Sequence, residues 1–84
     1  MMIERSAMNM EELLEILQEL KPGVEFEGQT RLFDDGILDS LDVVSLVSEI
    51  DDAFDVEISV VDLRPENFNS VEAMMALIER LQDE

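Results

Sequence analysis

Residues 35–54 read DGILDSLDVVSLVSEIDDAF, a turn followed by an amphipathic helical pattern. The Asp34-Asp35-Gly36 triplet is typical of a turn, and aspartate at position 39 is a residue type that caps helix N-termini. Beyond Asp39, apolar residues recur on one face with a period of 3.6 residues: Val43, Leu46, Val47, Ile50 and Phe54. This stretch predicts a helix over 40–53 that begins directly after a turn-rich loop.

Three further helices are predicted, over 10–20, 60–64 and 70–82. Asn9 opens the first with the spacing of a capping box. Ser59 and Asp62 repeat that spacing at the start of the second, and Pro65 is expected to stop it. Ser70 is expected to cap the third, which carries a broad apolar face.

The connection between the first two helices, residues 21–39, is long for a compact domain. Its apolar residues can pin it to the core: Val24, Phe26, Leu32, Phe33, Ile37 and Leu38. We therefore expect a packed loop. Because no segment shows alternation of strand length, the sequence predicts an all-α fold, with residues 1–84 forming a single domain of three longer helices and one short one.

The composition excludes several classes of function. The 84 residues hold 22 Asp and Glu against 5 Lys and Arg, a net charge of −17, with no His, Cys, Trp or Tyr. Without His or Cys the chain cannot build an imidazole base, a thiolate nucleophile, a soft metal site or a disulfide. Its negative field repels nucleic acid and anionic lipid. With no apolar run of about 18 residues and no signal-peptide pattern, we expect a cytoplasmic monomer without stable membrane insertion.

Ser40 stands out because its hydroxyl lies at the start of an amphipathic helix, behind a long loop. Unpaired N–H groups and the positive end of the helix dipole favour an anion there by about 0.3–1 kcal/mol. Repulsion from Asp39 and Asp42 partly offsets this. Since Ser and Asp are common at helix starts, the pattern alone favours ordinary capping over a modification site.

The stretch LDSLDVV at 38–44, continuing through 48–58, closely resembles the acyl carrier protein family. The Asp-Ser-Leu core, the acidic end of the second helix and the apolar-acidic-apolar exit after it all match, and the resemblance covers nearly the whole chain. It implies a four-helix bundle of acyl-carrier-protein type that carries a group and is not an enzyme. Ser40, flanked by Asp39 and Leu41, would hold 4'-phosphopantetheine from coenzyme A as a phosphodiester. The acyl or aminoacyl cargo would be bound as a thioester.

The resemblance also implies a recognition surface for partner enzymes on the second helix. Its residues are Leu41, Asp42, Val44, Ser45, Ser48, Asp51 and Asp52. These side chains would meet basic patches, with the charges affecting association rate and salt dependence more than affinity. The partners implied are a phosphopantetheinyl transferase, an adenylate-forming acyl or aminoacyl ligase, and a downstream acyltransferase or synthase.

Departures from the family pattern favour one branch of it. Carriers of fatty acid synthesis usually have Gly three residues before the serine, and an acidic residue and Met on the outer face of the second helix. This chain has Ile37, Ser45 and Ser48 at those positions. Gly36 one place earlier, and the segment PENF at 65–68, resemble standalone D-alanyl, aminoacyl or peptidyl carriers.

Other interpretations of the same residues remain open. An acidic helical adaptor or regulatory protein without a prosthetic group would use the second helix as a docking face. The side chains that would line a cavity for cargo, or simply pack the core, are Leu46, Val47, Ile50 and Leu63.

A calcium loop centred on Gly36 is excluded because Arg31 and Phe33 stand where carboxylates are required. A hydrolase with paired carboxylates is disfavoured, because a chain of this length leaves little room for a deep cleft and no carboxyl group is expected to have a raised pKa.

Overall fold

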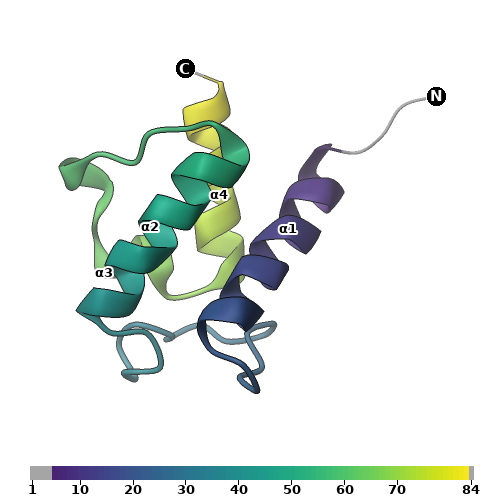
Figure 1. Ribbon diagram of the computed structural model, residues 1–84. Coiled ribbons are helices and arrows are strands. Elements are labelled where there is room, and N and C mark those ends of the chain that lie inside the picture. The colour runs from purple at the N-terminus through teal and green to yellow at the C-terminus, as the bar shows by residue number, and fades with distance from the viewer. Residues whose placement is uncertain (1–4, 84) are drawn as a thin grey trace.

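The computed structural model describes residues 5–83 and shows an all-helical domain with no strand in that range. The long helices are α1 (Arg5–Leu20), α2 (Ser40–Phe54) and α4 (Val71–Gln82), and a 3-10 turn, η1 (Val60–Asp62), precedes the short helix α3 (Pro65–Phe68) (Figure 1). Three long helices and one short helix confirm the predicted fold class. Within the described range, every helix is too short or too polar to cross a bilayer.

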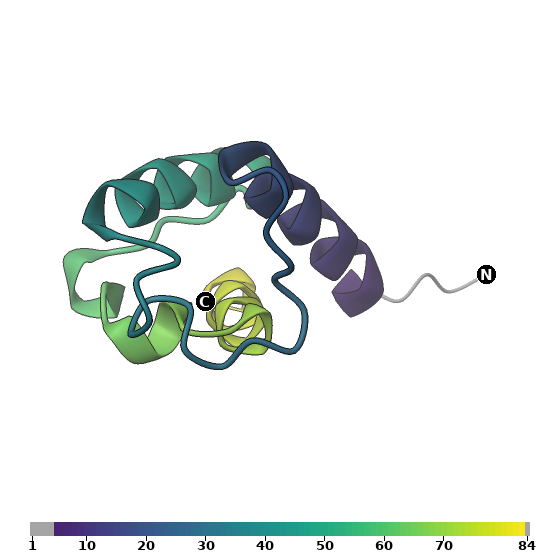
Figure 2. The same ribbon diagram turned by 90° about the horizontal axis from the view of Figure 1, so that it is seen from below.

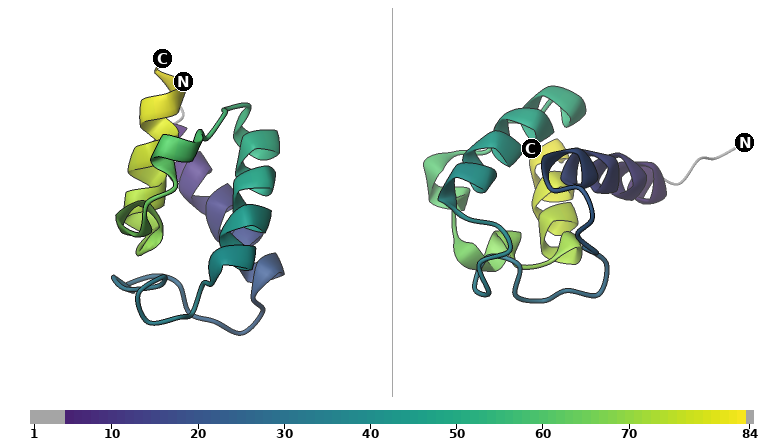
Figure 3. Two further views of the ribbon diagram at one scale, coloured as in Figure 1. Left: turned by 90° about the vertical axis from the view of Figure 1, so that its left-hand side faces the viewer. Right: turned by 60° about the horizontal axis from the view of Figure 1, so that its bottom comes forward.

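The long helices surround one core. Helix α1 packs against α2 and α4, and α3 packs against α4. The segment 21–39 crosses the end of the bundle at which α1 ends and α2 begins (Figure 1; Figure 2). Turned to the side, the domain shows this segment lying beneath the first turn of α2 (Figure 3). The loop therefore supports the end of the bundle at which Ser40 lies.

The core draws side chains from the loop as well as from the helices. Side chains with at most 1% of their surface exposed include Leu13, Leu17, Phe26, Leu32, Leu38, Leu46, Ile50, Phe68, Met74 and Ile78. Burying each stabilises the fold by roughly 1.5–3 kcal/mol. Three of them belong to the loop, and Val24, Phe33 and Ile37 pack partly buried against the core. The prediction of a packed loop is confirmed.

Helix α1 begins at Arg5 and not at Met10, so the predicted capping role of Asn9 is wrong. A capping residue stabilises a helix start by about 0.5–2 kcal/mol, and asparagine costs less than 1 kcal/mol inside a helix. Neither effect is large enough to prevent the helix from extending toward the N-terminus. The end of α1 at Leu20, before Pro22-Gly23, agrees with the sequence.

Pro65 begins a helix where the sequence predicted that it would stop one. The segment predicted as a helix over 60–64 is the 3-10 turn η1, and Pro65 is the first residue of α3. Proline suits that position because its fixed φ matches the helix and its missing N–H would have no partner there. Phe68, at the end of α3, is 1% exposed and anchors this short helix in the core.

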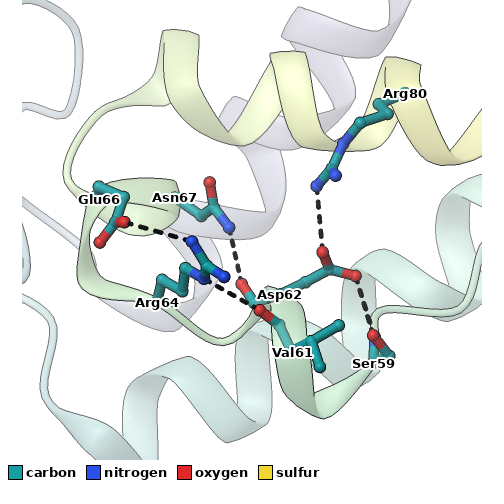
Figure 4. Close-up of polar contacts among 7 residues, drawn as sticks. All are labelled: Ser59, Val61, Asp62, Arg64, Glu66, Asn67 and Arg80. Carbon is teal, nitrogen blue, oxygen red and sulfur yellow. Dashed lines mark hydrogen bonds and ion pairs between the residues drawn. The ribbon is translucent and has the colours of Figure 1, made fainter.

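Asp62 ties η1 to α3 and α4 (Figure 4). Its carboxylate accepts hydrogen bonds from the Ser59 hydroxyl and from Arg80, both at 3.1 Å, and its backbone carbonyl accepts one from Asn67 Nδ2 at 2.8 Å. Burial raises the pKa of Asp62, but the hydrogen bonds from Ser59 and Arg80 outweigh it and hold the pKa below the ordinary 3.8. The ionised carboxylate therefore joins the start of η1 to α4, and the backbone carbonyl of the same residue holds α3.

Asp62→Asn is expected to destabilise the protein at neutral pH and to have little effect in strong acid. A carboxyl whose pKa is lowered by folding contributes stability above its unfolded pKa, and loses it as the pH falls through the folded pKa. In urea denaturation, the midpoint of Asp62→Asn should lie below that of the wild type at neutral pH, and the two should converge well below pH 3.8. Asp52→Asn, the same change at an exposed position, is the control. An Asp62→Asn deficit that persists in strong acid would contradict this.

Candidate functional site

Ser40 is exposed and is the first residue of α2. The chain approaches it through a turn in which Gly36 has φ of +80°, a left-handed conformation that glycine adopts without strain. Leu38, two residues before Ser40, is fully buried, and its N–H donates to the Leu32 carbonyl at 2.9 Å. Val43, three residues after Ser40, is also buried. These buried anchors on both sides hold Ser40 at the surface.

The cap of α2 is Asp39 and not Ser40. Asp39 Oδ1 accepts the Asp42 N–H at 2.9 Å, and Asp42 Oδ2 accepts the Asp39 N–H at 3.2 Å. This reciprocal capping box gives partners to two backbone N–H groups at the start of the helix. The residue pattern alone favoured ordinary capping at Ser40, but in the structure the cap is its neighbour Asp39. The serine hydroxyl is therefore not needed to begin the helix.

Asp42 lies between the cap and Lys21, whose Nζ is 3.1 Å from Asp42 Oδ2. The Asp42 side chain is 16% exposed. Burial raises its pKa, but the hydrogen bond from the Asp39 N–H and the Lys21 ammonium outweigh burial and hold the pKa below the ordinary 3.8. The sequence suggested that Asp42 contacts partners, whereas in the structure its carboxylate is engaged within the chain.

An exposed face of α2 adjoins Ser40. We call it the outer face of α2 and define it by Leu41, Val44, Ser45, Ser48 and Asp52, all of which are exposed. Leu41 and Val44 expose 77% and 65% of their surfaces. They are three positions apart and so lie on the same side of the helix. Because they are exposed and apolar and lie beside Ser40, they make this face a candidate protein-binding surface.

Asp51, also predicted to contact partners, holds the chain that leaves α2. Its Oδ1 accepts the Ile58 N–H at 3.1 Å, and its backbone carbonyl accepts the Val56 N–H at 3.3 Å. Asp55 closes the helix in a left-handed conformation with φ of 55°, which aspartate tolerates better than most residues. Asp51 therefore belongs to the end of the helix, while Asp52 beside it faces solvent.

Asn69 fastens the loop before Ser40 to the start of α4. Its Oδ1 accepts the N–H groups of Phe33 and Asp34 at 2.9 and 3.0 Å, and its Nδ2 donates to Asp34 Oδ2 at 3.2 Å. Its backbone carbonyl accepts the Leu32 N–H at 2.9 Å. Sequence patterns identified neither Asn69 nor Lys21, because both act on residues distant in the chain and no local periodicity signals such a pairing.

Four residues were expected either to line a cargo cavity or to pack the core. The structure buries some of them and exposes another. Leu46 and Ile50 are fully buried in the core and Val47 is partly buried, whereas Leu63 is 44% exposed. A groove of about 620 Å³ lies between the η1–α3 segment and α4. The residues along it include Val61, Arg64, Ala76, Leu77 and Arg80, and Ser40 is not among them.

Comparison with known proteins bears on Ser40 and on α2. A family described as "Phosphopantetheine attachment site" matches residues 11–83, a range that contains both. The chain is 32% identical over 74 residues to the D-alanyl carrier proteins of Listeria welshimeri serovar 6b and Listeria monocytogenes serotype 4a. Each match covers 86% of this chain and 95% of the relative.

Proposed function

The chain belongs to the phosphopantetheine-attachment family, whose members are carriers and not enzymes, and from this we propose that Ser40 is its attachment residue. When bound, the group supplies the thiol that this chain, with no cysteine, lacks. The chain's own contribution is to present the serine, to hold the surrounding turn and to offer a docking face. We propose that it carries an acyl or aminoacyl group in this way between partner enzymes.

The observation that carries the assignment is that Ser40 is exposed at the start of a 15-residue helix whose cap is provided by Asp39. The N-terminal end of a helix favours an anion by about 0.3–1 kcal/mol, which suits a phosphodiester. The carboxylates of Asp39 and Asp42 accept backbone N–H groups, and Lys21 opposes their charge. The residues at this position therefore fit the group.

For the cargo, we propose a small amino acid such as D-alanine, activated by an adenylate-forming ligase. The proposal is supported by the name of the relatives, which are D-alanyl carrier proteins. It is also supported by the packing of Leu46 and Ile50, which are fully buried in the core, and by Leu63, which faces outward. A short cargo would need no cavity among these side chains.

For the partners, we propose that a phosphopantetheinyl transferase, the ligase and a downstream acyltransferase or synthase dock on the outer face of α2. Leu41 and Val44 would supply the apolar contact, and Asp52 a charge at the edge. With a net charge of −17, the chain should attract partners with basic patches. Asp42 and Asp51 lie next to this face, where their carboxylates accept backbone N–H groups at the start and at the end of α2.

The assignment is tested by intact-mass measurement after incubation with coenzyme A and a broad-specificity transferase. The wild type should gain one phosphopantetheine and Ser40→Ala none. Ser45→Ala and Ser48→Ala, which remove other exposed hydroxyls of the same helix, should each still gain one phosphopantetheine. Because Ser40 is not the cap, Ser40→Ala should melt close to the wild type. Modification that persists in Ser40→Ala would refute the assignment of Ser40. A wild type that gains no phosphopantetheine would favour an acidic adaptor without a prosthetic group.

A further inference from the structure

The turn that presents Ser40 lies in the part of the chain where acidic residues most outnumber basic ones. Residues 32–63 hold ten Asp and Glu and neither Lys nor Arg. Any cation that balances the first turn of α2 must therefore come from outside this segment. Lys21, just after the end of α1, provides one by pairing with Asp42.

Lys21 reaches the capping box from a fixed position. Its N–H donates to the Leu17 carbonyl at 2.9 Å, and its own carbonyl accepts the Val24 N–H at 3.3 Å. Its ammonium lies 3.1 Å from Asp42 Oδ2, the same oxygen that accepts the Asp39 N–H at 3.2 Å. One carboxylate oxygen therefore joins the end of α1 to the residue that precedes Ser40.

The pairing matters because the capping box brings two carboxylates, Asp39 and Asp42, to one helical turn. The helix dipole favours both, but each repels the other. Without the Lys21 ammonium, that repulsion favours rotation of the Asp42 side chain into solvent, and the Asp39 N–H then loses its partner. Ser40 lies between these two residues and would fray with the turn.

We propose that Lys21 is a positioning residue for the modification of Ser40, and that Asp42 acts through its bond to Lys21 and not by touching the partner enzyme. The inference rests on the proposed function of Ser40. A positioning role for Lys21 and a direct contact role for Asp42 predict opposite effects of removing Lys21 on the rate of modification. If Asp42 met a basic partner directly, removing Lys21 would release a carboxylate for that contact and speed modification. If Lys21 positions the turn, removing it slows modification.

The test measures kcat and KM for phosphopantetheine transfer to the carrier, with coenzyme A saturating. Lys21→Gln should raise KM about two- to fivefold, as expected for the loss of a partly exposed ion pair, with kcat nearly unchanged. The reason is that, when the turn is formed in only a fraction of the molecules, the apparent affinity of the transferase for the carrier falls in proportion to that fraction. Lys21→Arg should restore the wild-type KM, and Lys21→Glu should raise it further.

Arg64→Gln is the matched control, because it makes the same change in net charge at an exposed position whose nearest carboxylate, Glu66, is 4.0 Å away. It should leave KM unchanged or lower it slightly by strengthening attraction to a basic partner. Hydrogen exchange provides a readout independent of the partner enzyme. The Asp39 and Asp42 amides should exchange faster in Lys21→Gln, while the amides of α4 should not.

The double variant Lys21→Gln, Asp42→Asn decides whether the two residues act together. Adding Lys21→Gln to Asp42→Asn should change KM little, because the bond is already lost. Additive effects, or a Lys21→Gln variant modified as fast as or faster than the wild type, would overturn this inference and leave the function of Ser40 standing. A wild type that accepts no phosphopantetheine would overturn both.

Discussion

Phe68→Ala is expected to lower the free energy of unfolding by about 3–5 kcal/mol, a large part of the roughly 5–15 kcal/mol that stabilises a domain of ordinary stability. Phe68 is 1% exposed and is the last residue of α3, which has four residues. A helix of one turn cannot stand by itself, so α3 depends on this ring and on the Asn67–Asp62 hydrogen bond for its place. Removing the ring leaves a cavity that so short a helix cannot fill.

Urea denaturation followed by far-UV circular dichroism measures this loss. Phe33→Ala is the matched control, since the same ring is removed from a partly exposed position in the loop. Phe33→Ala should lower the free energy of unfolding clearly less than Phe68→Ala does. Equal losses for the two variants would mean that the ring of Phe68 is not packed in the core as described.

Leu41→Ser is expected to lower kcat/KM for phosphopantetheine transfer by about tenfold or more, the loss typical of a central apolar contact in an interface. Leu41 follows Ser40 directly and exposes 77% of its surface, so a transferase that reaches the serine must cover it. The free energy of unfolding should hardly change, because the side chain is already in water. The effect would therefore come from docking and not from folding.

Val60→Ser is the control for that substitution. Val60 exposes 83% of its surface, but it lies on η1 and not on the outer face of α2. It should leave transfer to Ser40 close to the wild-type rate. A normal rate with Leu41→Ser, or equal losses with both variants, would show that the outer face of α2 is not the surface that the transferase recognises.

Local patterns were sufficient where the deciding interactions are local. The apolar period in residues 40–54 and the capping preference of Asp39 predicted α2 to within one residue, and Ser70 does cap α4, accepting the Ala73 N–H at 3.0 Å. The same rules failed at Asn9 and Pro65. In both cases a residue that is common at helix ends has a second permitted position, inside a helix or at its first residue, and only the surrounding packing selects between them.

The contacts that support Ser40 could not be predicted in this way. Asn69 holds Phe33 and Asp34 from 36 and 35 positions away, and Lys21 reaches Asp42 across the whole loop. Such pairs depend on how the loop folds over the end of the bundle, which no helical period encodes. The sequence predicted Ser40 as the attachment residue, but it did not predict the residues that hold its turn in place.

The attachment of phosphopantetheine to Ser40 can be measured by fragmentation mass spectrometry of the chain purified from the cells that encode it, with no transferase added. We predict one phosphopantetheine per chain, on the peptide that contains Ser40 and on that serine. A group found on any other residue, or a chain recovered entirely without it, would contradict the assignment of Ser40 as the attachment point.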